Sequence, residues 1–200
     1  MKTAKIFIKK GIVKDANSKN LAIFDKVCPD FMNQPARLAS EYVLDIWRKY
    51  EALNINNANT NGAIFEYIIA SLLIREQILP FYTQAKAAFV PNVIYDFLIY
   101  CQNMPIAISA KTSLRERYKQ ADLEGIALKY VHRKAKSYLL TLSTREANTL
   151  KEKIKDGQII GIDKIIDINT DDINELVAYI KTFKPQVAGS VQIISGNCVM

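Results

Sequence analysis

Residues 92–111 read NVIYDFLIYCQNMPIAISAK, and their residue types decide the fold. β-Branched and aromatic side chains dominate two runs within this stretch, Phe97–Cys101 and Ile106–Lys111, and such residues favour strands. The preceding run, Phe89–Tyr95, has a similar composition. Because strands joined by short connections usually pair antiparallel, we predict that these three runs form an antiparallel meander.

Helical periodicity brackets this meander on both sides. Before it, apolar residues at helical spacing predict helices over Pro35–Leu53 and Ala63–Leu79, with Asn61 as a candidate N-cap of the second and Pro80 ending it. After it we predict, in order, a helix over Leu114–His132, a strand over Ser137–Leu142, a helix over Thr144–Lys155, a strand over Ile159–Ile166 and a helix over Asp171–Phe183. This order is typical of an α/β or α+β fold with a mixed sheet between helices.

The composition favours one globular domain over residues 1–200. Half of the 200 residues are hydrophobic, which is enough for a single well-buried core, and Trp47 is expected to belong to it. The sequence shows neither an apolar run of about 18 residues nor an apolar signal core behind its basic start, so we expect a cytoplasmic protein with no membrane segment. The three cysteines are widely spaced and only one histidine is present, so reduced thiols are expected.

The net charge is +7 with a pI near 9.2, which favours a polyanionic partner. Many of the lysines and arginines fall between Lys111 and Lys136. This clustering is more informative than the total, because nucleic-acid binding needs positive charge gathered in one place.

The end of the meander combines a carboxylate with a lysine. Because side chains alternate along a strand, Ala107, Ser109 and Lys111 should share one face of IAISAK. Lys111 could also be an ordinary solvated strand end. Asp96 interrupts the β-rich run, where aspartate is disfavoured, and a bulge or strand end is the alternative explanation.

Two glutamates also interrupt apolar patterns. Glu124 shares a helical stripe with Ala121, Leu128 and Val131, and a buried carboxylate requires a partner. That partner could be a neighbouring lysine or arginine in a salt bridge, or a metal ion beside Lys111. Glu66 interrupts the apolar helix IFEYIIASLLI on the stripe expected to face the sheet.

These residue types suit phosphodiester hydrolysis. Mg²⁺ prefers oxygen ligands, stabilises charge on the scissile phosphate and lowers the pKa of the attacking water. A nearby lysine orients that water or the phosphate. The combination of three carboxylates and one lysine therefore indicates a metal-dependent site.

Residues Gly62–Leu142 resemble the PD-(D/E)xK nuclease superfamily, in particular the type II restriction endonucleases that read sites containing CC and GG steps. The resemblance makes Asp96 the first aspartate of the motif and Lys111 its lysine. Ser109 stands where the superfamily usually has an acidic residue. A subset of this branch instead takes that carboxylate from the next helix, about a dozen residues beyond the lysine, and residues 112–123 separate Lys111 from Glu124 here.

The resemblance implies roles for each residue. Asp96 and Glu124 would bind Mg²⁺, Lys111 would position the water, Ser109 would contact that water or the phosphate, and Glu66 would act behind them. In KTSLRERYKQ, Arg115, Glu116 and Arg117 resemble the triplet that reads C:G pairs in the major groove, and this suits arginine for guanine and a carboxylate for cytosine. Alternatively, they form a charged helix start in which Glu116 pairs with Lys119.

The implied protein is a restriction-endonuclease-like single nuclease domain over 1–200, with a helical subregion at 1–60, a catalytic core at 62–142 and an αβα extension at 143–200. It would cut double-stranded DNA at a short palindrome as a homodimer, with Lys119, Lys129 and Arg133 contacting phosphates. A cognate DNA methyltransferase is implied by the family only. The alternatives are a repair or structure-specific nuclease of the same superfamily, an inactive DNA-binding protein, and a basic α/β protein that never meets DNA.

Overall fold

The computed structural model describes residues 2–35, 37–90, 92–101, 104–189 and 193–200. Its strands form one six-stranded sheet in the order β5-β4-β3-β2-β1-β6. The strands are β1 (Phe81–Ala87), β2 (Tyr95–Cys101), β3 (Met104–Lys111), β4 (Lys136–Thr141), β5 (Lys164–Asp167) and β6 (Ile193–Val199). The helices are α1 (Thr3–Lys9), α2 (Lys19–Val27), η1 (Phe31–Asn33), α3 (Ala39–Glu51), α4 (Ala58–Arg75), α5 (Arg117–Val131), α6 (Thr144–Lys155) and α7 (Asp172–Lys181).

The sheet is mixed. β1, β2 and β3 pair antiparallel, β3, β4 and β5 pair parallel, and β6 runs antiparallel to β1 along the outer edge. The parallel strands are joined through α5 and α6, as parallel connections require. The predicted fold class, a mixed sheet flanked by helices, is confirmed.

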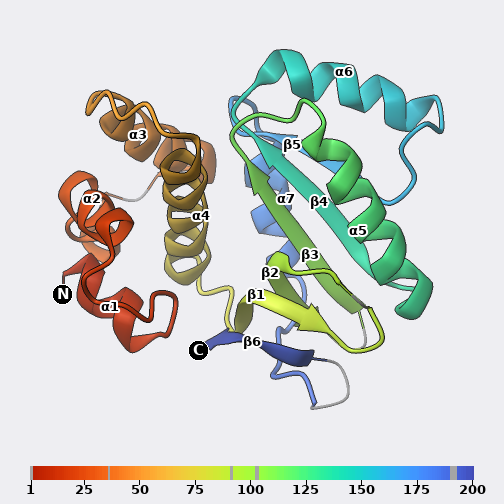
Figure 1. The fold of residues 1–200 in the computed structure, drawn as a ribbon, viewed down its shortest axis with the longest axis horizontal. Helices are drawn as coiled ribbons and strands as arrows, with labels where there is room; N and C mark the ends of the chain where they lie inside the picture. Colours follow the sequence, from red (N-terminus) through yellow and green to blue (C-terminus); the bar gives the residue numbers. More distant parts are fainter. Residues whose placement is uncertain (1, 36, 91, 102–103, 190–192) are drawn as a thin grey trace.

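Helices cover both faces of the sheet, and α1 to α4 gather beside it (Figure 1). The alternation predicted for β3 is confirmed, because Ile106, Ile108 and Ala110 join the core beneath α4 while Ala107 packs with Leu128 of α5. α4 contacts α2 and α3 as well as the sheet, which explains its nearly all-apolar surface. None of the helices in the described part of the chain has the length and apolar character needed to cross a bilayer.

The first predicted strand, Phe89–Tyr95, is wrong. Apart from residue 91, which lies outside the described residues, the segment before Tyr95 is a turn region. Phe89 is 75% exposed and, like Asn92, has a positive φ that breaks an extended run. The strand that pairs with β2 is instead β1, and neither β1 nor β6 is in the sequence prediction.

Several predicted boundaries also need correction. The N-cap of α4 is Asn57, whose side chain accepts from the backbone N–H of Thr60, rather than Asn61. Asn61 instead accepts a hydrogen bond from the Tyr50 hydroxyl at 2.6 Å. α4 ends at Arg75, and β5 covers only the end of the predicted Ile159–Ile166 run. The prediction for α6 agrees at both ends, Trp47 is buried, and the three cysteines are free thiols.

Two glycines fix the position of α5 against the chain that leads into β5. A Cβ on Gly125 would lie 2.4 Å from the carbonyl oxygen of Gly161, and a Cβ on Gly161 would lie 2.0 Å from that of Asp122. The Asp122 carboxylate also accepts from the N–H groups of Ile160 and Gly161. α5 therefore packs backbone to backbone here, which sets where its other side chains lie.

Candidate active site

Asp96 and Lys111 meet where β2 begins and β3 ends. Lys111 Nζ donates to Asp96 Oδ2 at 2.7 Å, and the backbone N–H of Ala110 donates to the same oxygen at 3.0 Å. Asp96 is only 9% exposed, so its charge requires these partners. The antiparallel register, in which Phe97 lies opposite Ile108, brings these strand ends together.

Ser109 lies on the same side of β3 as Lys111. It is half-buried, two residues before the lysine. The alternation along β3 directs both side chains away from the core under α4 and toward the α5 side. Ser109 and Lys111 therefore share the face predicted for them.

Glu124 lies on α5 and is half-buried. Burial raises the pKa of its carboxyl group, the hydrogen bond from Gln120 and the charge of Lys111 lower it, and the charge of Asp96 raises it further. Its hydrogen-bond donor is the neutral amide of Gln120, at 2.7 Å, rather than a lysine or arginine. The Tyr95 hydroxyl donates to the Glu124 backbone oxygen at 3.1 Å, which ties α5 to β2.

Glu66 approaches Asp96 from α4. Burial and then the charge of Asp96 raise the pKa of Glu66 to about 7, although Lys111 and a hydrogen bond from Gln84 oppose the shift. Gln84 Nε2 donates to Glu66 Oε2 at 3.3 Å. Glu66 and Asp96 both line a cavity of about 170 Å³, together with Thr83 and Gln84 of β1.

Asp96, Glu66 and Glu124 offer carboxylate oxygens, which are the ligands that Mg²⁺ prefers. Among the described residues, no group of three or more Asp, Glu, His or Cys is already arranged around a metal position. Mg²⁺ is commonly held by one or two carboxylates, with phosphate oxygens and waters completing its shell. Asp96 and Glu124 would supply two carboxylates of this kind to such a site.

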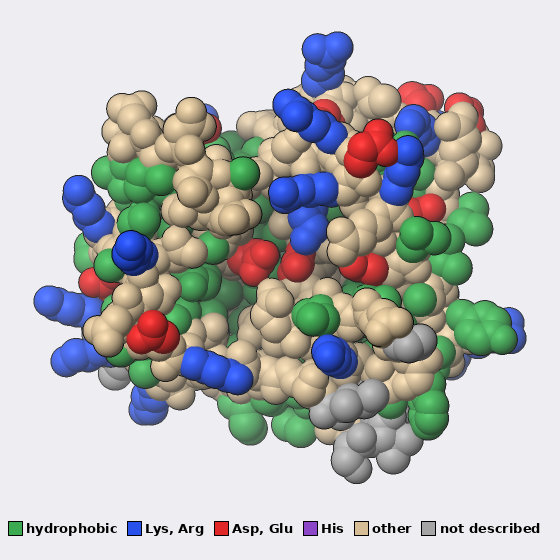
Figure 2. All heavy atoms as spheres, in the orientation of Figure 1, with side chains coloured by type: hydrophobic (Ala, Val, Ile, Leu, Met, Phe, Trp, Pro, Cys, Tyr) green, Lys and Arg blue, Asp and Glu red, His purple; other side chains and the backbone are tan. Residues whose placement is uncertain are grey.

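Acidic and basic side chains occupy different parts of the face shown in Figure 2. Figure 2 shows acidic side chains around a hollow in the middle of the face, with lysine and arginine side chains above them. An acidic centre bordered by positive charge suits a ligand that brings both phosphates and a cation.

The triplet Arg115, Glu116 and Arg117 lies at the junction of β3 and α5, and all three side chains are exposed. Glu116 pairs with Lys119 at 2.5 Å, the contact that the alternative explanation predicts. This ion pair is on the surface and leaves both arginines in solvent.

The three lysine and arginine residues expected at phosphates differ in their surroundings. Lys129 pairs with Asp163 at 2.8 Å, and Lys136 shares that carboxylate at 3.1 Å. Arg133 and Lys119 are exposed. Arg133 and Lys119 are therefore more accessible to a large anion than Lys129.

Among solved structures, the chain is similar to the restriction endonuclease PspGI in its complex with substrate DNA. The TM-score is 0.51, the sequence identity is 15%, and the match covers 92% of this chain and 83% of that one. The chain has a restriction endonuclease fold. No family model and no curated protein matches the sequence.

Within this restriction endonuclease fold, sequence reasoning missed two polar contacts near the candidate site. Gln84 was missed because it belongs to β1, which carries no clear strand signal. Glu146 of α6 contacts the segment that holds Arg115. The spacing Ser143-x-x-Glu146 is a signal for a helix cap, and it gives no indication of this distant contact.

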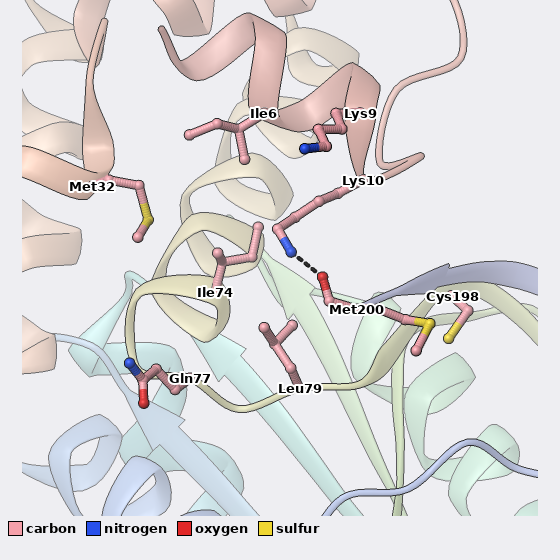
Figure 3. Close-up of a pocket in the computed structure, with 9 residues that line it drawn as sticks. All are labelled: Ile6, Lys9, Lys10, Met32, Ile74, Gln77, Leu79, Cys198 and Met200. Atoms are coloured by element: carbon pink, nitrogen blue, oxygen red, sulfur yellow. Dashed lines mark hydrogen bonds between the residues drawn. The ribbon is translucent and has the colours of Figure 1, made fainter. Parts of the chain in front are cut away.

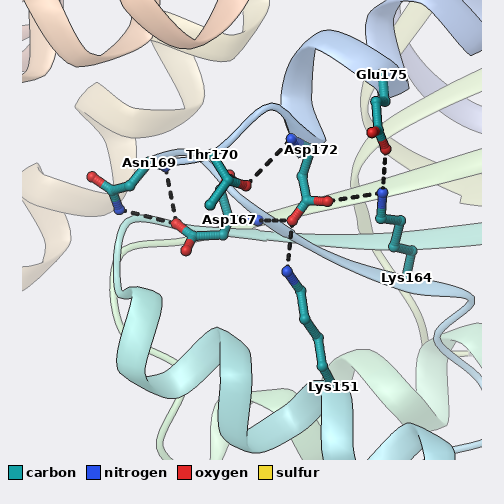
Figure 4. Close-up of polar contacts among 7 residues, drawn as sticks. All are labelled: Lys151, Lys164, Asp167, Asn169, Thr170, Asp172 and Glu175. Carbon is teal, nitrogen blue, oxygen red and sulfur yellow. Dashed lines mark hydrogen bonds and ion pairs between the residues drawn. The ribbon is translucent and has the colours of Figure 1, made fainter.

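Two other features lie outside the candidate site. A mainly apolar pocket of about 880 Å³ lies between α1, the end of α4 and β6, and is shown in Figure 3. A polar network centred on Asp172 joins β5, α6 and α7 (Figure 4). Neither contains a residue of the carboxylate and lysine cluster.

Proposed function

We propose that this protein is a Mg²⁺-dependent type II restriction endonuclease that cuts double-stranded DNA at a short palindrome containing C:G pairs. The observation that carries the proposal is the contact between Asp96 and Lys111. Glu66 and Glu124 lie near enough to this pair that its charges shift the pKa of each glutamate. The fold shared with a restriction endonuclease and the net charge of +7 support it.

In the proposed reaction, Asp96 and Glu124 would hold Mg²⁺. The ion supplies charge neutralisation at the phosphate and a lower pKa for the attacking water. Lys111 has three N–H donors, so it can keep its bond to Asp96 while donating to the water or to a phosphate oxygen. The Ser109 hydroxyl would contact the same water or phosphate from the same strand face.

Glu66 lies behind this group. Its raised pKa, about 7, keeps the carboxyl ready to gain or lose a proton near neutral pH. Because Glu66 lines the same small cavity as Asp96, it is placed to hold a water molecule between α4 and the sheet. Glu66 would thereby order a water molecule beside Asp96.

Recognition falls to the exposed triplet after β3. Arg115 and Arg117 would each donate to guanine O6 and N7, and Glu116 would accept from cytosine N4. Lys119, Lys129 and Arg133 would contact phosphates, which orient the duplex without reading it. Cutting both strands of a palindrome is most simply done by two copies related by symmetry, so we include a homodimer, and a cognate methyltransferase, in the proposal.

Digestion of a plasmid of known sequence tests the proposal. With Mg²⁺ and the wild-type protein we expect discrete fragments, whose ends give the site and the stagger of the cuts. A smear, or cutting only at junctions, would indicate a different nuclease. Salt-dependent duplex binding without cutting would indicate an inactive DNA-binding protein, and no salt-dependent binding would exclude DNA as the ligand.

A further inference from the structure

The segment between β3 and α5, residues 112–116, is held by the carboxylate of Glu146 on α6. Glu146 Oε2 accepts from the backbone N–H of Leu114 at 2.9 Å, and Oε1 accepts from that of Arg115 at 3.3 Å. The Ser113 hydroxyl donates to Oε1 at 3.5 Å. Three consecutive residues therefore converge on a side chain from α6.

The Glu146 carboxylate is available for this contact because the backbone N–H of Ser143, which it would bind in an ordinary helix cap, already has another acceptor. Ser143 is the N-cap of α6 and its hydroxyl accepts from the N–H of Glu146. In such a cap the glutamate normally accepts from the N–H of the serine. Here the Thr141 hydroxyl takes that N–H at 3.2 Å, so the Glu146 carboxylate reaches the neighbouring segment instead.

The segment needs this support because its backbone is unusual. Arg115 has a φ of +25°, which residues with a Cβ rarely adopt. Leu114 is 1% exposed and packs against Leu150 and Ala147 of α6, which anchors the segment from the same side. With Leu114 inward and the backbone bonded to Glu146, the Arg115 side chain stays in solvent.

α6 also supports the first turn of α5. Lys153 Nζ lies 4.7 Å from the centre of the Tyr118 ring and donates to its hydroxyl at 2.8 Å. α6 therefore contacts the chain on both sides of Arg117, at residues 113–115 through Glu146 and at Tyr118 through Lys153. α6 carries none of the proposed base-reading residues, but it contacts the backbone of Arg115 and the side chain that follows Arg117.

We propose that Glu146 is a positioning residue for sequence recognition, holding residues 113–115 so that Arg115 and Arg117 present a fixed pair of guanidinium groups. This inference rests on the proposed function. Glu146 itself need not touch DNA. Its loss should reduce the ability to distinguish the preferred site from a near match more than it reduces cutting itself.

The experiment compares E146Q and E146A with E152Q. Glu152 is on the same helix, is exposed and pairs with Lys155, so E152Q makes the same charge change away from the segment. In E146Q the amide keeps one oxygen acceptor but points N–H groups at backbone donors. For each variant, kcat and KM are measured on the preferred site and on sites altered at one base pair.

For E146Q we expect the ratio of kcat/KM between preferred and altered sites to fall about tenfold, with a larger fall for E146A and no change for E152Q. One misplaced arginine fork accounts for a change of this size. Hydrogen exchange of the Leu114 and Arg115 amides should be at least about tenfold faster in E146A. An equal loss of activity on both sites, or an unchanged ratio, would overturn the inference and leave the proposed function standing.

If the wild-type protein cuts no DNA, the proposed function fails and the role in recognition fails with it. The exchange measurement is independent of cutting. It still reports whether Glu146 holds residues 113–115, so the two failures are distinguishable.

Discussion

Lys111 Nζ lies 2.7 Å from Asp96 Oδ2, across the two strands of a hairpin. The same ammonium group lowers the pKa of Glu66 and of Glu124, while Asp96 raises both. One lysine therefore balances the charge of carboxylates from α4, β2 and α5. Replacing it changes the electrostatics of all of them.

Lys111→Ala should reduce Mg²⁺-dependent cutting by about 100-fold to 1000-fold, because a donor aimed at the reacting phosphate or water is lost. Duplex affinity should change little, since most of it comes from other positive residues. Single-turnover cutting and a binding titration measure the two effects, and Lys155→Ala on distant α6 is the control. A melting curve checks that the variant is still folded, because Asp96 loses the Lys111 ammonium group as its partner. Cutting within tenfold of wild type would contradict the proposed role.

Glu66→Gln should remove a pH dependence of stability in metal-free buffer. The pKa of Glu66 in the folded protein is about 7, above its ordinary value of 4.5, so the folded state binds the proton more tightly. The stabilisation is complete below about pH 4.5 and is lost as the pH rises through about 7. Urea unfolding should therefore show that the free energy of unfolding of Glu66→Gln, relative to that of wild type, is higher at pH 8 than at pH 5.

Glu51→Gln, at an exposed position on α3, is the matched control for Glu66→Gln. It should behave like wild type at both pH values. If the free energy of unfolding differs between Glu66→Gln and wild type by the same amount at pH 5 and at pH 8, the pKa of Glu66 is not raised by folding.

Gly161→Ala should destabilise the protein by about 1–3 kcal/mol, because a Cβ would meet the backbone of α5 at 2.0 Å and force the helix to move. Since α5 carries Glu124, cutting should fall as well. Gly62→Ala is the control, because its Cβ would enter open space within α4. That change should be neutral or stabilise by up to about 1 kcal/mol. Similar melting temperatures for the two variants would refute the close approach.

Asp172→Asn should weaken the junction of β5, α6 and α7. The Asp172 carboxylate contacts Lys151 at 2.7 Å and Lys164 at 2.8 Å (Figure 4). Although burial opposes it, hydrogen bonds from these lysines lower the pKa of Asp172 to about 2. The stabilisation is present above pH 3.8 and is lost as the pH falls through about 2.

After allowance for solvent screening, Asp172→Asn should cost about 1 kcal/mol at pH 7 and very little near pH 2. Denaturant unfolding at both pH values measures this. Glu175→Gln, which pairs with the same Lys164 but is largely exposed, should have a smaller effect. Equal effects of the two substitutions would mean that the lower exposure of Asp172 adds nothing to its contribution to stability.

The sequence indicates those parts of the structure that depend on local periodicity. Alternation along IAISAK places Ser109 and Lys111 on one face, and helical spacing gives α6 at both ends and the buried Ala121 and Leu128 on α5. Such patterns report which side of an element is buried. They need no knowledge of its neighbours.

Contacts between distant segments are not accessible in this way. The sequence does not predict β1, because hydrogen bonds from its distant partners β2 and β6 are what make FYTQAKA a strand. The Glu146 contact to Leu114 joins residues 32 positions apart, and the sequence gives only a cap signal there. The approach of Glu66 to Asp96 likewise depends on how α4 packs.

The pairing of β1 with β6 has a consequence for biosynthesis. β1 is complete at residue 87, but its second neighbour begins only at residue 193. Until that strand arrives, one side of β1 shows unpaired N–H and C=O groups, which promote association between growing chains. Chaperone dependence and the yield of soluble protein during expression should therefore depend on how quickly residues 193–199 reach β1, and substitutions in β6 should affect solubility before they affect chemistry.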